Sequence, residues 1–433
     1  LMYPLPRKSG FSQRHNLFPR PTRFLPENLT SLCPGLARSP VSLPLIRDDV
    51  LQFGNITPRP ACRLLSYAIS LARNAFYLPL QKMIHLNDIF NYDLPIWKSS
   101  PGLPWKEYGF STKNEIRQSR EAINYIRGFW HQVKYGRKMY FPDSCAFVRS
   151  HLVEYGEKKV RAVWGYPATV TFGEAMYAVP LIEAYRKVSS PIAYGYETAI
   201  GGAHKILSEC VGRYKYAIDF KAFDKTVPKW LIKVAFDILF CNIDFAEYRD
   251  YGIADAEKNI RMFDSLVDYF IHTRIRLCNG ERYKKSGGIA SGSYFTQLVG
   301  SIANYIVITW MCLKLTGKPP KYIRVLGDDS IFSSDDEFSL IDANDVVETL
   351  GMHLNLKKSA VSRSLNDLTF LGYQINHGMP SKPLSKWMAA LLFPERSDEC
   401  WDDVATRALG LLYACSAVCT IFDSLCRTII NLR

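Results

Sequence analysis

The sequence predicts an α+β fold, because short strand patterns and longer helical patterns are mixed along its second half. Residues 214–219 and 322–327 alternate in the manner of strands, and residues 331–333 continue after a tight turn. Hydrophobic residues make up 48% and charged residues 22% of the 433-residue chain, which is enough to bury a sizeable core in two to four domains or one large one. Amphipathic or buried helices are predicted at residues 230–240, 293–313 and 338–350.

The chain carries 54 Lys and Arg against 41 Asp and Glu, a formal net charge of +13 at pH 7. An excess of this size favours a polyanionic partner, with nucleic acid as the first candidate and a membrane surface as the second. Between residues 106 and 161, twelve basic and six acidic side chains are interleaved with aromatic ones. That composition is typical of a groove that binds nucleic acid, although ordinary surfaces share it.

The N-terminal part of the chain predicts an arm followed by helices. Residues 1–55 are rich in proline and carry seven basic side chains against three acidic ones, so we expect an extended arm. Apolar positions recur at helical spacing from about residue 60, which predicts helices with breaks as far as Trp130.

One uncharged stretch, residues 294–313, is long enough to span a bilayer. It contains several polar side chains, and Lys314 follows at once. We therefore predict a buried core helix, and a soluble protein without membrane insertion.

The eleven cysteines are scattered, with no Cys-x-x-Cys pair and no histidine at ligand spacing. Neither a zinc site nor a disulfide framework is predicted, which indicates a reducing compartment. Cys415 and Cys419 stand four residues apart in an apolar run and are expected to be small core residues.

One pair of acids is set apart by its surroundings. Asp328 and Asp329 follow Gly327 between two apolar runs that favour strands, so a hairpin turn would present both carboxylates at the rim of a buried sheet. For the other acid pairs, a solvated surface or a helix N-terminus is expected. These pairs are Asp48–Asp49, Asp335–Asp336 and Asp402–Asp403.

A second acid leaves a strand in the same way. Asp219 ends an apolar strand, and Asp224 follows at the start of a segment that resembles a helix. If the two strands are neighbours, Asp219 and Asp328 converge, and they would repel strongly unless divalent cations lie between them. Oxygen ligands without imidazole or thiolate favour Mg²⁺ or Mn²⁺ over zinc, and two such ions can perform in-line phosphoryl transfer.

A third element is the loop of glycine and serine at residues 286–300, directly before the long uncharged helix. Its backbone N–H groups and hydroxyls, with Ser291, Gly292 and Thr296 around a helix N-terminus, could hold a phosphate or a sugar.

Taken in order, these segments resemble the palm motifs of viral RNA-dependent RNA polymerases. Motif A of that family, Asp-x4-Asp, is matched by Asp219 and Asp224; motif B, Ser-Gly-x3-Thr, by Ser291, Gly292 and Thr296; and motif C, Gly-Asp-Asp, by Gly327, Asp328 and Asp329. Residues 99–105 and 158–167 resemble motifs G and F, and residues 354–362 and 369–376 resemble motifs D and E. The amino-acid sequences of motifs F and B are most similar to those in the polymerases of partitiviruses. These viruses carry segmented double-stranded RNA.

The resemblance implies a right-hand polymerase with fingers, a palm made of an antiparallel sheet flanked by helices, and a short, mainly helical thumb. The expected parts are the arm at 1–55, fingers at 56–205, palm with motif A at 206–240, a fingers insertion at 241–285, palm with motifs B to E at 286–376, and a thumb, either compact or truncated, at 377–433.

The resemblance also implies roles for single residues. Asp219 and Asp328 would hold two Mg²⁺ or Mn²⁺ ions with the help of Asp329. Lys358 would donate a proton to pyrophosphate, although its neighbour Lys357 is an alternative. The triphosphate would be gripped by Lys158, Lys159 and Arg161.

The nucleotide and the template have further candidate contacts. Asp224 would accept a hydrogen bond from the ribose 2′ hydroxyl, and the motif B residues Ser291, Gly292 and Thr296 would help to bind the NTP. Many relatives carry an asparagine where this chain has Gly300, so Asn304, one turn later, is a candidate for the sugar contact. The loop of Ser100, Pro101 and Gly102 would lie beside the template path.

The implied function is an RNA-directed RNA polymerase that copies a viral genome. Its partners would be the RNA template, the nascent RNA, NTPs and a viral capsid protein, within a viral particle in the host cytoplasm. Two alternatives stay open: a reverse transcriptase, and a non-catalytic RNA-binding or capsid-associated protein with a degenerate polymerase fold. Gly327 argues against the first, and the intact acids Asp219, Asp328 and Asp329 argue against the second.

Overall fold

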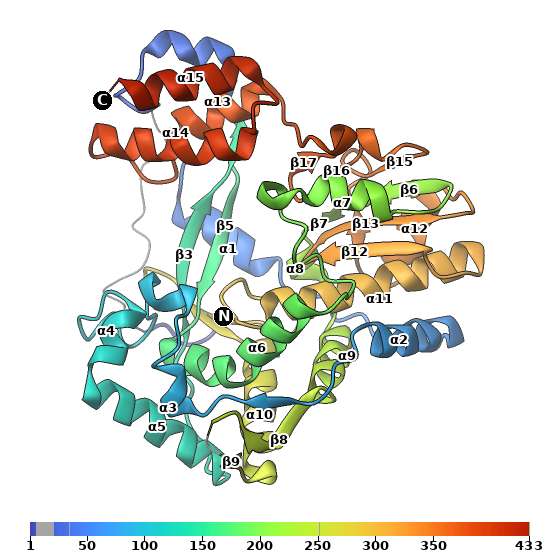
Figure 1. Ribbon diagram of the computed structural model, residues 1–433. Helices are drawn as coiled ribbons and strands as arrows, with labels where there is room; N and C mark the ends of the chain where they lie inside the picture. The colour runs from blue at the N-terminus through green and yellow to red at the C-terminus, as the bar shows by residue number, and fades with distance from the viewer. Residues whose placement is uncertain (6–20, 34, 251, 433) are drawn as a thin grey trace.

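The computed structural model describes residues 1–5, 21–33, 35–250 and 252–432. The chain folds into three parts arranged as a right hand, with the C-terminal helices at the top of Figure 1, the central sheet and its helices at the right, and the remainder at the lower left. Residues 6–20, which belong to the expected N-terminal arm, lie outside the described residues.

The palm contains four antiparallel strands in the order β12-β13-β6-β15. One face of this sheet is packed by aromatic rings, since Tyr216 stacks on both Phe332 and Phe338 at centroid distances of 5.0 and 4.3 Å. The predicted strands are confirmed, and β13 begins earlier than expected because Asp329 pairs with Leu326 in the hairpin. The strands are β6 (Tyr214–Ala217), β12 (Tyr322–Leu326), β13 (Asp329–Ser334) and β15 (Ala360–Ser362).

The long helix α11 (Thr296–Thr316) lies at the centre of the main hydrophobic core, and every residue from Leu298 to Leu313 is buried. Among the described residues it is the one helix long and apolar enough to cross a membrane, and 89% of its most apolar window is buried inside the protein. The predicted core helix is therefore confirmed. Helices α9 (Lys229–Phe240) and α12 (Leu340–Glu348) pack against it.

Helix α2 (Arg63–Ala75) also packs against α11, below the palm sheet in Figure 1. Residues 191–193 extend the edge of the sheet through two backbone hydrogen bonds of 2.8 Å with Val325. These contacts place both ends of residues 56–205 against the palm, and their assignment to the fingers stays a prediction. Helical periodicity shows that a segment has a face to bury, but it does not show what covers that face.

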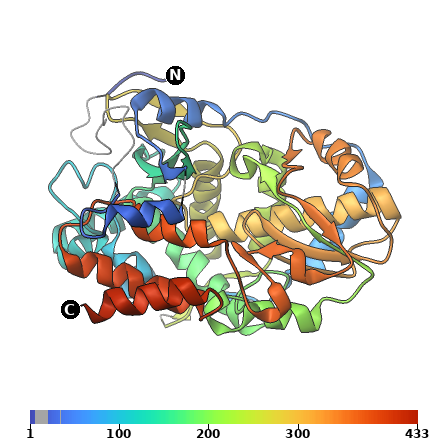
Figure 2. The same cartoon turned by 90° about the horizontal axis from the view of Figure 1, so that it is seen from above.

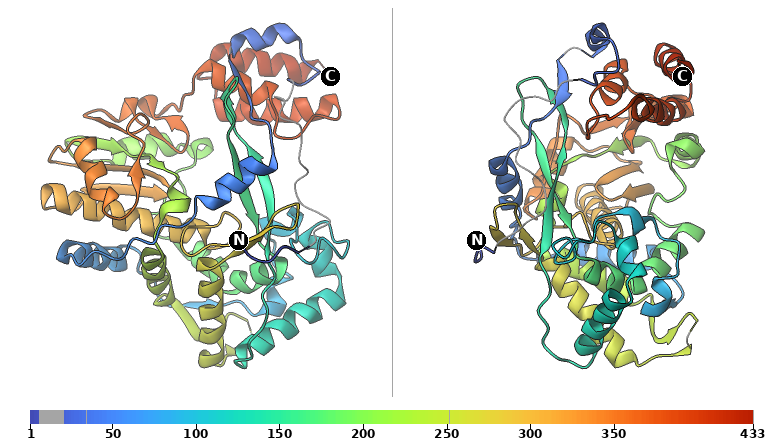
Figure 3. Two further views of the ribbon diagram at one scale, coloured as in Figure 1. Left: turned by 180° about the vertical axis from the view of Figure 1, so that it is seen from behind. Right: turned by 90° about the vertical axis from the view of Figure 1, so that its left-hand side faces the viewer.

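The fingers are built on a second sheet, in the order β11-β10-β3-β5. Its long hairpin of β3 (Ser144–Ser150) and β5 (Val160–Gly165) rises toward the thumb, as both views in Figure 3 show. Strands β10 (Arg274–Arg276) and β11 (Arg282–Lys284) come from the expected insertion and join this sheet beside β3. The helices of this region are α4 (Lys113–Gln118), α5 (Arg120–Lys134), α6 (Ala168–Lys187) and α10 (Ala256–Ile271).

The thumb is helical, as predicted, with α13 (Leu384–Leu392), α14 (Trp401–Cys415) and α15 (Thr420–Asn431). Residues of the N-terminal arm, among them Leu25 and Ala37, share its hydrophobic core. In Figure 2 the blue arm runs beside the red thumb helices.

The arm is not simply extended. It forms a 3-10 helix (Glu27–Leu32) that packs on α13, a strand β1 (Leu36–Arg38) that pairs with β4 (Leu152–Glu154) near the tip of the fingers hairpin, and a helix α1 (Leu43–Leu51) that packs on β5. The arm thus joins the thumb to the fingers.

The remaining strands and helices are β2 (Gln81–Met83), α3 (Leu86–Ile89), α7 (Gly202–Glu209), β7 (Phe220–Lys221), α8 (Phe223–Thr226), β8 (Ile243–Tyr248), β9 (Gly252–Ile253), β14 (His353–Leu354), β16 (Thr369–Phe370) and β17 (Tyr373–Gln374).

Candidate active site

The two central strands of the palm bring three carboxylates to one edge of the sheet. Asp219 follows β6 and Asp329 opens β13, and because these strands run antiparallel, the end of one lies beside the start of the other. Asp328 lies in the turn between β12 and β13, directly after Gly327, whose φ of 60° is a conformation that glycine adopts without strain. The pairing of β6 with β13 thus brings Asp219 beside the two acids of the hairpin.

Burial and mutual repulsion both disfavour negative charge at this edge. Burial, followed by the charges of Asp328 and Asp219, raises the pKa of Asp329 to about 7. Burial and Asp328 likewise raise the pKa of Asp224 to about 6. The pKa of Asp219 is raised mainly by burial, with Lys358 opposing the rise and Asp328 adding to it. A positive charge placed among these carboxylates would therefore stabilise them.

The backbone at the acids is held by hydroxyl and amide side chains. The N–H of Asp219 donates to Oγ of Ser359 over 3.0 Å, and that hydroxyl in turn donates to the carbonyl of Asp219 over 3.2 Å. The N–H of Gly327 donates to Oγ of Ser301 over 2.9 Å. These contacts fix the two chain segments that carry the carboxylates.

Asn304 lies beneath the turn of motif C and is fully buried. Its Nδ2 donates to the carbonyl oxygens of Gly327 and Asp329, over 3.0 and 3.2 Å. Asn304 supports the turn and is not among the residues that line the cavity in front of it, and its contact with a ribose stays a prediction.

The motif B loop is fastened to the fingers. Oγ of Ser291 accepts a hydrogen bond of 3.0 Å from the N–H of Trp164 on β5, and a Cβ added at Gly292 would lie 1.7 Å from the carbonyl oxygen of Trp164. The hydroxyl of Thr296 donates to the carbonyl of Ala290 over 2.6 Å. Ser291 lines the cavity, whereas Gly292 and Thr296 shape the loop behind it.

A cavity of about 570 Å³ lies between these acids and a basic wall formed by the fingers. Asp219, Asp224 and Asp328 line one side, and Lys358 of the motif D segment also lines the cavity. Both Lys357 and Lys358 are exposed, but Lys357 is not among the residues that line the cavity. The basic wall is formed by Lys158, Lys159 and Arg161.

The expected template loop lies outside this cavity, against the end of the fingers hairpin. The carbonyl of Pro101 accepts a 2.8 Å hydrogen bond from the N–H of Ala168, and Nζ of Lys113 donates to the carbonyl of Ser100 over 2.6 Å. A Cβ added at Gly102 would lie 2.7 Å from the carbonyl of Tyr166, so the loop approaches the hairpin closely.

Sequence reasoning missed two residues that connect these parts. Asp49 is buried and ion-paired with Lys225, which follows Asp224, so the expectation of a solvated Asp48–Asp49 pair is wrong for Asp49. Glu174 on α6 is also buried, and accepts hydrogen bonds from the hydroxyl of Ser293 and from the N–H of Tyr294 in the motif B loop. Burial raises the pKa of Glu174 to about 8.

The residues present fit a magnesium-type site. The donors are carboxylates whose charges repel one another, and none of the described residues that line the cavity carries an imidazole or a thiolate. Across residues 1–5, 21–33, 35–250 and 252–432, no three His, Cys, Asp or Glu side chains form a ready-made metal cluster.

The chain resembles polymerases of known viruses. It is 27% identical over 330 residues to the RNA-directed RNA polymerase of Atkinsonella hypoxylon virus, covering 65% of this chain and 49% of that protein. It is 28% identical over 366 residues to that of Cryptosporidium parvum virus 1, covering 77% of this chain and 66% of that protein. The matches thus span about half to two thirds of the length of these relatives, which are partitivirus-like, as the motifs predict.

A solved structure with the same fold is that of an insertion-loop deletion mutant of the RNA-dependent RNA polymerase of a human picobirnavirus. The TM-score is 0.72 at 16% identity, and the match covers 94% of this chain and 81% of that one. The likeness confirms the predicted right-hand α+β fold. The family model described as viral RNA-dependent RNA polymerase matches residues 85–430, well over half of the chain. This protein therefore belongs to the family of viral RNA-dependent RNA polymerases.

Proposed function

We propose that this chain replicates and transcribes a viral RNA genome, joining NTPs to the 3′ end of an RNA strand that it copies from an RNA template. The observation that carries the proposal is the placement of Asp219 and Asp328 across one cavity from Lys159 and Arg161. A polymerase fold without catalysis would be free to lose either wall of that cavity, and this chain keeps both.

The acidic wall is the proposed metal site. Asp219 and Asp328, with Asp329 beside them, would hold two Mg²⁺ or Mn²⁺ ions. Bound ions would supply positive charge at the attacking 3′ oxygen and at the leaving pyrophosphate. The chain itself keeps the acids in register, because Ser359 and Asn304 hold the two backbone segments that carry them.

The basic wall is the proposed triphosphate site. Lys158, Lys159 and Arg161 line the cavity from the fingers, where they would bind phosphate oxygens and orient the nucleotide. Lys358 lines the same cavity, and its charge opposes the rise in the pKa of Asp219. From there it would donate a proton to the departing pyrophosphate.

Selection of ribonucleotides is assigned to Asp224. Its carboxylate lines the cavity next to the metal site, where it can accept a hydrogen bond from a ribose 2′ hydroxyl. Ser291 lines the same cavity from the motif B loop. Deoxyribonucleotides lack the hydroxyl that Asp224 would bind, so they should be poor substrates.

The proposed macromolecular partners follow from the activity. Template and nascent RNA would pass between the fingers and the palm, with the loop of Ser100, Pro101 and Gly102 beside the template. Since the relatives are polymerases of partitivirus-like viruses, we place the enzyme in a viral particle in the host cytoplasm, in contact with a capsid protein.

The test is synthesis of RNA by the purified chain from a single-stranded RNA template, four NTPs and Mg²⁺. Asp328→Ala should abolish synthesis without lowering the melting temperature. The matched control is Asp336→Ala, which removes an exposed acid beyond the far end of β13 and should leave synthesis unchanged. Undiminished synthesis by Asp328→Ala, or a preference for dNTPs over NTPs, would overturn the proposal.

A further inference from the structure

The hairpin of β10 and β11 places four cations on one face of the fingers sheet. Arg274 stands opposite Lys284 in the register, and Arg276 stands opposite Arg282. Residues two apart on a strand point to the same face, so all four charges lie together. Like charges directly opposite one another on a sheet are destabilising, and each pair therefore calls for an anion.

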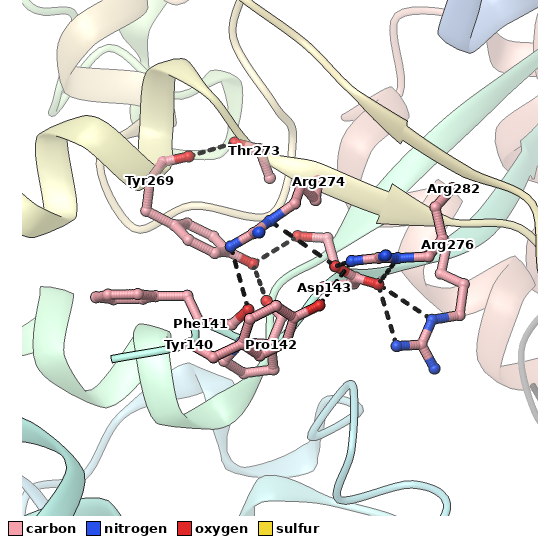
Figure 4. A network of polar contacts seen from close by, with 10 residues as sticks. Tyr140, Phe141, Pro142, Asp143, Tyr269, Thr273, Arg274, Arg276 and Arg282 are labelled. Carbon is pink, nitrogen blue, oxygen red and sulfur yellow. Dashed lines mark hydrogen bonds and ion pairs between the residues drawn. The ribbon is translucent and has the colours of Figure 1, made fainter. Parts of the chain in front are cut away.

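The first pair has its anion inside the protein. Asp143 is fully buried, and its carboxylate accepts hydrogen bonds of 3.1 and 3.0 Å from Arg276 and of 2.6 and 2.8 Å from Arg282. Figure 4 shows both guanidinium groups turned toward this single carboxylate. Four charge-assisted hydrogen bonds occupy both oxygens of Asp143, and the carboxylate of Glu107 lies 3.7 Å from Arg276. Two acids thus face the two arginines of the first pair.

The second pair has a much weaker share of counter-ions. Arg274 makes only a long ion pair, with Nε 3.9 Å from the carboxylate of Asp143 that Arg276 and Arg282 already share. Its guanidinium also donates a 3.4 Å hydrogen bond to the carbonyl of Phe141 and lies 5.0 Å from the ring centre of Tyr140. Within the described part of the chain, no carboxylate lies at ion-pair distance from Lys284, which is exposed. The uncompensated positive charge of the hairpin is therefore concentrated at Arg274 and Lys284.

Both of these residues line a pocket of about 460 Å³ between the end of α5, helix α10 and the hairpin. Phe141 and Tyr269 contribute aromatic surface to it, and their rings contact each other at 5.7 Å. Among the described residues, five lysines and arginines line the pocket, against one acid, Asp268. The cations are Arg137, Lys138, Arg261, Arg274 and Lys284.

We propose that this pocket is a second RNA-binding site, in which phosphates of an RNA strand take the place beside Arg274 and Lys284 that Asp143 takes beside Arg276 and Arg282. Positive charge together with aromatic surface is the combination that holds single-stranded nucleic acid. The pocket shares no lining residue with the catalytic cavity, so an RNA strand held there is held apart from the reacting end. The choice of RNA as the polyanion rests on the proposed function.

The test is the salt dependence of RNA binding to the whole chain. Binding of a fluorescein-labelled single-stranded oligouridylate is measured by anisotropy over a range of salt concentrations, for the wild type and for Lys138→Gln with Lys284→Gln. Both lysines are exposed, so the fold should tolerate the change. The double variant should bind more weakly, and the slope of log K against log salt should be shallower by about 1.4, or 0.7 for each lost phosphate contact.

The matched control is Lys233→Gln with Lys318→Gln, which removes two exposed charges on the palm side, one on α9 and one in the bend that follows α11. It lowers the net charge by the same amount, so a specific site requires a larger effect from the pocket variant. Equal affinity and slope in the two double variants would overturn the proposal. Binding of a fluorescent GTP analogue is measured for the same proteins. If the pocket variant lost GTP binding and kept wild-type RNA binding, the proposal would be overturned, because the pocket would then hold a free nucleotide.

The outcome is separable from that of the proposed function. RNA binding is measured without NTPs and can be repeated in Asp328→Ala. If the wild type makes no RNA but the pocket variant still shows the shallower slope, the polymerase proposal fails and the second site stands. If synthesis is normal and the slope is unchanged, the second site fails alone.

Discussion

Oδ1 of Asp49 lies 2.6 Å from Nζ of Lys225, and both side chains are almost enclosed, with 8% and 13% of their surfaces exposed. The other carboxylate oxygen accepts a 2.8 Å hydrogen bond from the N–H of Ala162 on β5. One acid on α1 thus holds the strand that carries Arg161 against the short helix that carries Asp224. The N-terminal arm is in this way part of the frame of the active site.

Asp49→Ala should therefore be strongly destabilising. It leaves the charge of Lys225 and the N–H of Ala162 without their partner in a buried place, which costs about 3 kcal/mol or more of the free energy of unfolding. Chemical denaturation measures this change. Adding Lys225→Met should recover part of the loss, since it removes the unpaired charge.

The neighbouring acid supplies the control for that experiment. Asp48 is exposed, and Asp48→Ala should change the free energy of unfolding by less than about 0.5 kcal/mol. Equal effects of the two substitutions would contradict the role given to Asp49.

The local motifs of the palm could be predicted from the sequence, whereas its long-range connections could not. Asp328 and Asp329 are placed by a strand, a glycine and a second strand that are contiguous in the chain, so their position at the sheet edge follows from pattern alone. Asp49 looks like half of a surface pair, because a single sequence does not show which face of α1 meets Lys225. The sequence does not show that Arg274 and Lys284 lie opposite each other, because this depends on the register of β10 and β11.

Two glycines of motif B differ in the room that they have. A Cβ at Gly292 would lie 1.7 Å from the carbonyl oxygen of Trp164, whereas a Cβ at Gly300 would make ordinary contacts, the nearest at 3.5 Å with Cα of Gly327. Gly292→Ala should push the loop away from β5, destabilise the protein by about 1–3 kcal/mol and impair RNA synthesis.

Gly300→Ala is the matched control for the loop. Gly300 lies inside α11, where alanine is favoured over glycine by up to about 1 kcal/mol, so this variant should be as stable as the wild type or more stable. Denaturation midpoints and RNA synthesis distinguish the two variants. A Gly292→Ala protein that matched Gly300→Ala in both would refute the close approach to Trp164.

Glu174 makes stability depend on pH. Burial raises its pKa from 4.5 to about 8, so between these values the folded state binds a proton that the unfolded state has released. The contribution of this group to the free energy of unfolding is therefore greatest at low pH and falls by up to about 1.4 kcal/mol per unit as the pH rises from about 5 to 8.

Glu174→Gln should remove that slope. The amide imitates the protonated acid and can keep partners in Ser293 and the N–H of Tyr294, so the variant should equal the wild type near pH 5 and exceed it in stability near pH 8. Parallel stability curves for the two proteins between these pH values would show that Glu174 is ionised throughout.

The two adjacent lysines of motif D should behave differently. Lys358 lines the cavity and Lys357 does not, so Lys358→Met should lower kcat by about 100-fold, as expected for loss of a general acid, while Lys357→Met should have little effect. Steady-state kinetics with saturating NTPs measure both. If Lys358→Met raised the KM for NTPs and left kcat unchanged, Lys358 would be a binding residue and not the proton donor.

The acids of the palm sheet are proposed to catalyse nucleotide addition directed by an RNA template. The most direct measurement is addition of a single nucleotide to an RNA primer annealed to templates that differ at one base, with each NTP supplied alone in the presence of Mg²⁺. The wild type should add only the complementary ribonucleotide, and Asp219→Asn should add none while keeping the wild-type melting temperature. Addition that ignored the template base, or that survived in Asp219→Asn, would contradict the claim.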